Sequence, residues 1–122
     1  MADKVRVGVV GVGYLGRFHA LIYSRMAGVD LVGVVDADPK RAAEVAAEAG
    51  CGVFSDAGAL AAATDAVSVV VPTTAHLEVA ARLLERGTHM LIEKPIAATV
   101  ADGAEIVRIA EAAGAILQAR MI

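Results

Sequence analysis

Residues Val5–Gly16 read V-R-V-G-V-V-G-V-G-Y-L-G. The stretch begins as an apolar run rich in β-branched residues, turns at Gly11–Val12–Gly13, and continues with helical apolar spacing. A strand, a glycine turn and a helix in this order are the context in which G-x-G-x-x-G indicates a dinucleotide site. Gly11 would allow the tight turn, Gly13 would let the backbone approach a pyrophosphate, and Gly16 would let the helix pack against the first strand.

The helix that follows the glycine turn is predicted to point its N–H groups and its positive dipole end at the phosphates. The predicted pyrophosphate site is therefore the loop itself, Gly11, Val12, Gly13, Tyr14, Leu15 and Gly16. We expect the apolar stripe on the same helix to face the core, and its members are Leu15, Phe18, Ile22 and Met26. His19 is interpreted as a packing residue.

A second strand-like run, Asp30–Val35, ends in Asp36, twenty residues after Gly16. A dinucleotide fold holds its ribose ligand at this place. Asp36 could instead cap the turn before Pro39, although Asp38 is better placed for that. A carboxylate here accepts hydrogen bonds from ribose hydroxyls and repels a 2′-phosphate, which favours NAD over NADP. The neighbouring Lys40 and Arg41 weigh against that preference, because either could turn toward a phosphate.

Composition limits the class of protein. At 122 residues the chain is expected to form one domain with a sizeable core, spanning residues 1–122. The hydrophobic fraction is 57% but only 3% is aromatic, so Ala, Val, Leu and Ile must build the core. This composition suits a buried parallel sheet covered by Ala-rich helices.

Several other classes are disfavoured by the same sequence. No apolar run approaches the roughly 18 residues of a membrane helix, and the N-terminus lacks the apolar region of a signal peptide. The one cysteine, Cys51, can form no internal disulfide and offers no metal-site spacing, so we predict no metal and a reduced, cytoplasmic protein. A net charge of −3 without a basic cluster argues against a nucleic-acid partner.

The rest of the chain alternates strand-like and helix-like segments. Strands are expected near residues 6–10, 30–35, 52–54, 66–71, 88–92 and 115–118, and helices near 14–26, 40–49, 75–86 and 100–113, with a short Ala-rich helix before Thr64. Asp38, Thr99, and either Thr73 or Thr74 are expected to cap helices. The pattern predicts an α/β Rossmann fold, a doubly wound parallel six-stranded sheet in the order 3-2-1-4-5-6.

Three motifs occur in sequence: G-V-G-Y-L-G-R-F-H with its Asp36, V-P-T-T-A-H after the fourth strand, and E-K-P after the fifth. Together they resemble the N-terminal domain of the Gfo/Idh/MocA family of nicotinamide-dependent oxidoreductases, which includes glucose–fructose oxidoreductase and inositol dehydrogenase. Each motif alone is modestly specific, but all three at these spacings are highly specific. The resemblance covers essentially the whole chain.

The resemblance implies that Glu93 and Lys94 approach the nicotinamide end of a bound cofactor. Lys94 would be the catalytic residue, positioning or polarising the reacting hydroxyl or carbonyl. The resemblance also implies that Pro72, Thr73 and His76 line the cofactor groove near the nicotinamide ribose. From the residues alone, a solvated ion pair at a strand end is the favoured interpretation of Glu93 and Lys94. His76 could be an ordinary residue of a helix's first turn.

Members of that family carry a second, largely β-sheet domain after the sixth strand, which supplies most substrate contacts. We therefore expect this chain to be an isolated cofactor-binding half. It would bind NAD(H) without efficient turnover, and the full enzyme would transfer hydride between nicotinamide and a sugar or polyol hydroxyl.

A non-catalytic nucleotide-binding or assembly module is the alternative function. Oxidation of sugars or polyols with NAD, and its sensitivity to Lys94→Ala, distinguish the two. The absent domain would leave apolar surface beside the sixth strand and an open sheet edge, so we also expect a homodimer.

Overall fold

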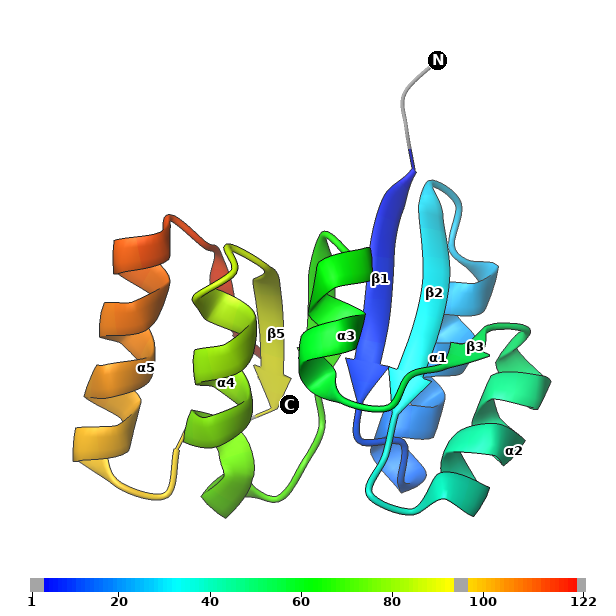
Figure 1. The fold of residues 1–122 in the computed structure, drawn as a ribbon, viewed down its shortest axis with the longest axis horizontal. Helices are drawn as coiled ribbons and strands as arrows, with labels where there is room; N and C mark the ends of the chain where they lie inside the picture. Colours follow the sequence, from blue (N-terminus) through cyan, green and yellow to red (C-terminus); the bar gives the residue numbers. More distant parts are fainter. Residues whose placement is uncertain (1–3, 94–96, 121–122) are drawn as a thin grey trace.

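The apolar runs and glycine turns of the sequence fold into one parallel sheet with helices on both faces (Figure 1). The computed structural model describes residues 4–93 and 97–120, without the side chain of residue 120. The strands are β1 (Val5–Val10), β2 (Val29–Val35), β3 (Gly52–Val53), β4 (Ala66–Val69), β5 (His89–Glu93) and β6 (Leu117–Arg120). Their spatial order, β3-β2-β1-β4-β5-β6, confirms the predicted topology.

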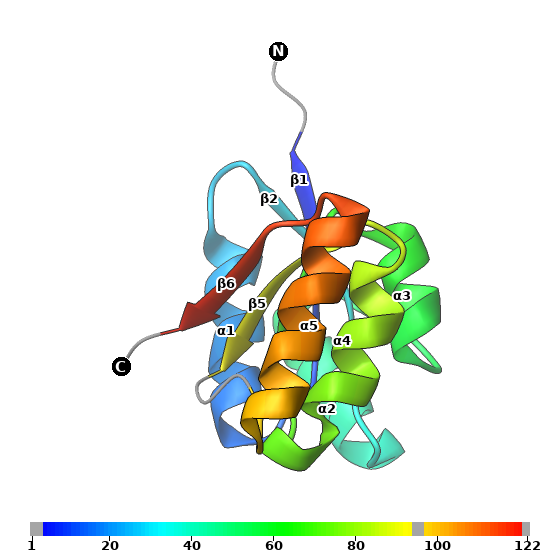
Figure 2. The same cartoon turned by 90° about the vertical axis from the view of Figure 1, so that its left-hand side faces the viewer.

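Helices cover the sheet from two sides (Figures 1 and 2). They are α1 (Tyr14–Arg25), α2 (Pro39–Ala49), α3 (Ala57–Ala63), the 3-10 turn η1 (Thr73–Ala75), α4 (His76–Leu84) and α5 (Val100–Ala113). Buried residues of α1 and α2 share one core cluster with Val9 and Val34, and those of α3, α4 and α5 share another with Val67 and Val69. Because both faces are covered, the central strands consist mostly of apolar residues.

Side-chain caps fix where several helices begin. The carboxylate of Asp38 accepts hydrogen bonds from the backbone N–H groups of Lys40 and Arg41, and the hydroxyl of Thr99 accepts one from Asp102. Both caps confirm the predictions. The short α3 begins in the same way, at Asp56. Such caps satisfy N–H groups that have no partner within the helix.

The segment after β4 differs from the prediction. The strand ends at Val69 rather than residue 71, and neither Thr73 nor Thr74 caps a helix. Instead Pro72 precedes η1, which leads into α4 at His76. The strand β6 also begins later than predicted, because the Ala115 N–H still bonds to the Ala110 carbonyl and closes α5.

The apolar stripe of α1 faces outward, so the prediction that it lies in the core was wrong. Phe18, Ile22 and Met26 are 40%, 56% and 45% exposed. The buried residues of the helix are instead Gly16, His19 and Ala20. Small residues on that face let the α1 backbone approach the sheet closely, which turns the larger apolar side chains of the adjacent face away from the core.

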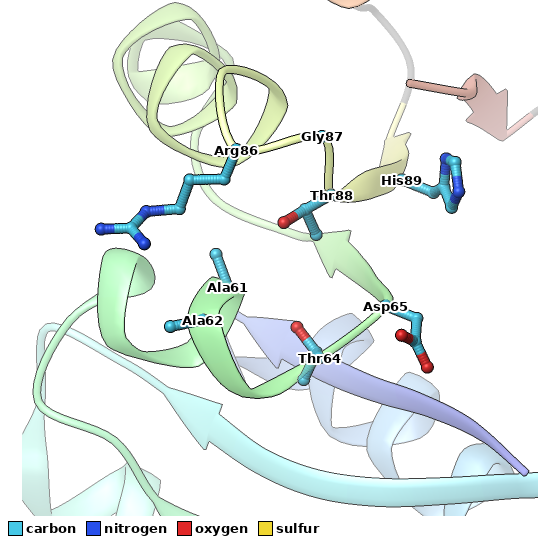
Figure 3. Close-up of a pocket in the computed structure, with 8 residues that line it drawn as sticks. All are labelled: Ala61, Ala62, Thr64, Asp65, Arg86, Gly87, Thr88 and His89. Atoms are coloured by element: carbon cyan, nitrogen blue, oxygen red, sulfur yellow. The ribbon is translucent and has the colours of Figure 1, made fainter. Parts of the chain in front are cut away.

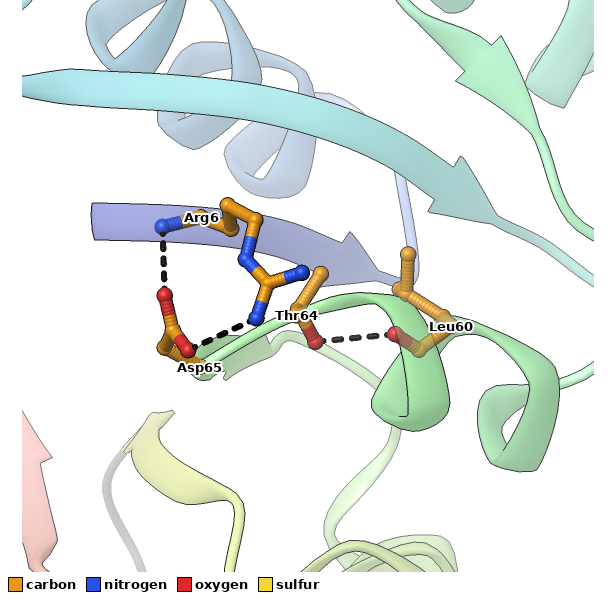
Figure 4. A network of polar contacts seen from close by, with 4 residues as sticks. All are labelled: Arg6, Leu60, Thr64 and Asp65. Atoms are coloured by element: carbon orange, nitrogen blue, oxygen red, sulfur yellow. Dashed lines mark hydrogen bonds and ion pairs between the residues drawn. The ribbon is translucent and has the colours of Figure 1, made fainter. Parts of the chain in front are cut away.

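A hollow of about 340 Å³ lies at the amino ends of β4 and β5 (Figure 3). Its lining consists of Ala61, Ala62, Thr64, Asp65, Arg86, Gly87, Thr88 and His89. The polar groups on its rim have structural partners (Figure 4). Asp65 accepts hydrogen bonds from the Arg6 backbone N–H (2.9 Å) and guanidinium (3.2 Å), and the Thr64 hydroxyl donates to the Leu60 carbonyl. These bonds tie β1 to the start of β4.

The Asp65 contacts make stability depend on pH. The Arg6 backbone N–H, followed by its side chain, holds the pKa of the Asp65 carboxyl below its ordinary value of 3.8. A depressed pKa stabilises the folded state above the ordinary value, and this contribution is lost as the pH falls through the folded-state pKa. Asp65→Asn should therefore lower the free energy of unfolding at pH 7, and its deficit should shrink below about pH 4.

Urea unfolding at several pH values measures this deficit, and Glu111→Gln, which removes an exposed carboxylate of α5, is the matched control. A deficit that stays constant down to pH 2.5 would contradict the assignment.

Candidate dinucleotide-binding site

The loop between β1 and α1 contains two glycines at which a larger residue would clash with the backbone. Gly11 has φ +90°, and its N–H donates to the Val35 carbonyl at 2.8 Å. A Cβ on Gly11 would lie 2.3 Å from the Val70 carbonyl oxygen, and one on Gly16 would lie 1.8 Å from the Gly11 carbonyl oxygen. Gly11 therefore makes the tight turn, and Gly16 lets α1 start directly against the loop.

Gly13 has a different environment from those two glycines. It is the N-cap residue of α1 with φ −66°, which any residue can adopt. A Cβ there would meet only the Arg41 guanidinium, at 3.8 Å. The missing side chain at Gly13 thus leaves space beside the helix N-terminus, where a phosphate could approach the backbone.

Asp36 holds the glycine loop from the end of β2. One carboxylate oxygen accepts the Val12 N–H at 2.8 Å, and the other accepts the Asp38 N–H at 2.8 Å. A carboxylate can accept about four hydrogen bonds, so these two leave capacity for hydroxyl groups of a ligand. Asp36 therefore fixes the loop and can bind a ligand at the same time.

Two cavities border this loop. The first, of about 280 Å³, is lined by Val10, Gly11, Gly13, Val35, Asp36, Ala37, Arg41, Val70, Val71 and Pro72. The second, of about 250 Å³, is lined by Val12, Gly13, Tyr14, Arg17, Arg41, Glu44, Val45 and Glu48. They meet at Gly13 and Arg41. The predicted site residues Gly11, Val12, Gly13, Tyr14, Asp36 and Pro72 therefore lie along one groove at the carboxyl edge of the sheet.

The helices that begin at this edge are of two kinds, those with a side-chain cap and those without one. Side chains cap α2, α3 and α5, whereas α1 and α4 have no capping side chain. These two helices follow β1 and β4, the neighbouring strands from which the chain departs in opposite directions. The crevice at such a switch point is where open α/β sheets bind ligands. The two uncapped N-termini supply positive dipole ends there.

The other predicted site residues that the structure describes do not line either cavity. Leu15 is half-buried, and Thr73 begins η1. The side chain of His76 is buried, with Nε2 3.0 Å from the Val71 carbonyl oxygen, so it holds the loop that carries Pro72. Glu93 is buried at the end of β5. Lys94, the predicted catalytic residue, lies outside the described residues.

The structure gives two residues a larger role than the sequence analysis did. Arg41, weighed only as a possible phosphate ligand, stands where the two cavities meet. His19, interpreted as packing, is buried but also lies 2.9 Å from the Glu93 carboxylate through Nε2. The signal for Arg41 was its place in the first turn of the helix after Asp36. No local signal linked His19 to a residue 74 positions away.

Other kinds of site find little support in the described part of the chain. Residues 4–93 and 97–120 contain no group of three His, Cys, Asp or Glu side chains that could hold a metal ion. Over the same residues, no helix combines the length and apolar character needed to cross a membrane. Burial raises the pKa of the Cys51 thiol, which keeps it in the unreactive protonated form.

Residues 5–121 match the model of a family described as "Oxidoreductase family, NAD-binding Rossmann fold", GFO_IDH_MocA. The chain belongs to the Gfo/Idh/MocA family. Among curated relatives, it is 52% identical over 91 residues to UDP-N-acetylglucosamine 3-dehydrogenase of Acidithiobacillus ferrooxidans, covering 75% of this chain and 28% of that protein. It is 44% identical over 108 residues to inositol 2-dehydrogenase 1 of Saccharopolyspora erythraea, covering 84% and 32%.

Two solved structures superpose closely on this fold. The Acidithiobacillus ferrooxidans enzyme GnnA matches with a TM-score of 0.91 at 42% identity, covering 97% of this chain and 38% of that one. GenD2 from gentamicin A biosynthesis, solved in complex with NAD, matches with a TM-score of 0.91 at 28% identity, covering 98% and 35%. The chain thus spans about a third of the length of these relatives and solved structures.

The contact between Gly16 and Gly11 predicts an unusual response to alanine. Glycine to alanine inside a helix normally stabilises by about 1 kcal/mol. Gly16→Ala should instead destabilise by about 2 kcal/mol or more, since its Cβ would overlap the Gly11 carbonyl. Gly103→Ala in α5 is the matched control, because its Cβ would lie 3.8 Å from the nearest atom. Urea unfolding measures both, and a Gly16→Ala variant as stable as the wild type would contradict the loop geometry.

Proposed function

We propose that this chain binds NAD(H) along the groove at the carboxyl edge of the sheet. The pyrophosphate would lie against the glycine loop and the N-terminus of α1, and the adenine ribose would lie at Asp36. The observation that carries the proposal is the meeting, in one groove, of the Asp36 carboxylate with a helix N-terminus that no side chain caps. The NAD bound to the related GenD2 supports the same reading.

We further propose that NAD is preferred over NADP. The Asp36 carboxylate would accept hydrogen bonds from the ribose hydroxyls and would repel a 2′-phosphate. Arg41 opposes this preference, because its guanidinium lines the same cavity as Asp36. We propose that Asp36 has a larger effect than Arg41 on the choice of cofactor, since two backbone N–H groups fix the Asp36 carboxylate in place.

The reaction we propose for the whole protein is hydride transfer between nicotinamide and a sugar-like or polyol hydroxyl. It rests on relatives whose names describe dehydrogenases of UDP-N-acetylglucosamine and inositol. Bound NAD(H) would supply the hydride chemistry. Lys94 would position or polarise the reacting oxygen, and Glu93, Pro72, Thr73 and His76 would shape the nicotinamide end. The isolated chain would bind the cofactor without efficient turnover.

Titration of the chain with NADH and with NADPH, followed by nicotinamide fluorescence, tests cofactor binding. We expect saturable NADH binding that is tighter than NADPH binding. Asp36→Ala should weaken NADH binding by about tenfold, because it removes a charged acceptor and also releases the Val12 N–H. The same change should reduce the preference for NADH over NADPH. Asp30→Ala, an exposed aspartate at the start of the same strand, should change neither affinity. No saturable binding of NADH would overturn the proposal.

A second proposal concerns assembly: we keep the homodimer expected from sequence but place its contact on the exposed apolar face of α1 rather than beside β6. This face surrounds a groove of about 420 Å³ lined by Phe18, Leu21, Ile22, Arg25 and Met26. Contiguous apolar surface of this kind marks interaction sites on soluble proteins. Sizing chromatography should give a dimer for the wild type and for Ser24→Glu on the same helix, but a monomer for Ile22→Glu. A monomeric wild type at high concentration would contradict this proposal.

A further inference from the structure

The sheet-facing side of α1 carries polar groups where apolar ones would be expected. His19 Nε2 lies 2.9 Å from a carboxylate oxygen of Glu93 on β5. One turn further along the helix, the Tyr23 hydroxyl lies 2.5 Å from the hydroxyl of Ser68 on β4. The rings of His19 and Tyr23 meet edge to face, with centroids 6.4 Å apart. These contacts form a polar seam between α1 and the two strands on one side of the switch point.

Burial makes the His19–Glu93 pair costly as a purely structural contact. His19 is 7% exposed and Glu93 is 9% exposed. Taking a carboxylate and an imidazole out of water costs several kcal/mol that their mutual attraction barely offsets, and an apolar pair of similar volume would pack at least as well. The same helix face already packs closely through Gly16 and Ala20. A gain in stability is therefore a weak explanation for this pair.

Glu93 lies at the same edge of the sheet as the groove. Val69 and Ile92 are register partners on β4 and β5, and Glu93 follows Ile92 at the carboxyl edge. From the same edge of β4, residues 70–72 run along the groove beside Asp36. The helix α1 therefore touches both parts of the edge, since its N-terminus borders the glycine loop and His19, in its second turn, contacts Glu93.

We propose that His19 is a positioning residue: its imidazole fixes the Glu93 carboxylate at the carboxyl end of β5, so that the nicotinamide half of the cofactor meets an oriented acceptor. The proposal rests on the proposed binding of NAD(H). In it, α1 couples the pyrophosphate and nicotinamide ends through one rigid element. His19 acts through Glu93 and has no contact with the adenine half of the cofactor.

Comparison of NADH with ADP separates this role from a general structural one. ADP carries the adenine, ribose and pyrophosphate but lacks nicotinamide, so it reports only on the glycine loop and Asp36. Calorimetric titration should show that His19→Leu weakens NADH binding by about tenfold and leaves ADP binding within about twofold. His19→Gln should restore most NADH affinity, because its amide nitrogen can donate a hydrogen bond to Glu93 from a similar place.

Two further variants sharpen the experiment. Tyr23→Phe removes the other polar contact of the seam on the same helix face, and it should leave the NADH-to-ADP affinity ratio unchanged. Glu93→Met removes the acceptor oxygens, so it should lower that ratio, and adding His19→Leu to it should lower the ratio little further, because both changes remove the same interaction.

The outcomes that overturn the inference are distinct from failure of the proposed function. If the wild type binds neither NADH nor ADP, both proposals fail. If it binds both, but His19→Leu reduces the two affinities equally or not at all, only the positioning role is wrong. Should His19→Leu fail to fold, as judged by circular dichroism, Glu93→Met decides: an unchanged NADH-to-ADP ratio in that variant overturns the inference.

Discussion

The close approach of Gly16 to the carbonyl of Gly11 is the constraint on which the remaining architecture depends. With no Cβ at either position, α1 begins directly beside the end of β1 and its N-terminus stays at the carboxyl edge of the sheet. Asp36 can then reach across from β2 and accept the Val12 N–H, which holds the loop open beside Gly13. A backbone loop built in this way presents N–H groups to an anion, with the Arg41 guanidinium beside Gly13.

The close packing of α1 on the sheet also explains why the large apolar residues of this helix face outward. A helix that lies so close to the sheet has room only for small residues and for side chains that reach between strands, such as His19 and Tyr23. Its large apolar residues are consequently left on the outer face, where Phe18, Ile22 and Met26 remain exposed. The helix therefore has a tightly packed face toward the sheet and an apolar face toward the surface.

Strand order, helix caps at Asp38 and Thr99, and the glycine turn could be predicted from sequence because each depends on local chemistry. Alternation of apolar runs with capped helices leaves few topologies for a parallel sheet. The buried face of α1 could not be predicted, because it depends on the depth at which the helix packs rather than on apolar spacing. The same is true of the His19–Glu93 contact, which joins residues 74 positions apart, and of η1, where Pro72 rather than a threonine sets the start.

The central claim is that a dinucleotide binds at the carboxyl edge, and not in the hollow at the amino ends of β4 and β5. Backbone amide chemical shifts recorded by NMR during addition of NADH test this claim directly, since each edge has its own reporters. Binding at the carboxyl edge should give progressive shifts at residues 11–17, 36–38, 70, 71 and 73, with residues 64–65 and 86–89 unchanged. Shifts centred on the second group, or absent from the glycine loop at saturating NADH, would contradict it.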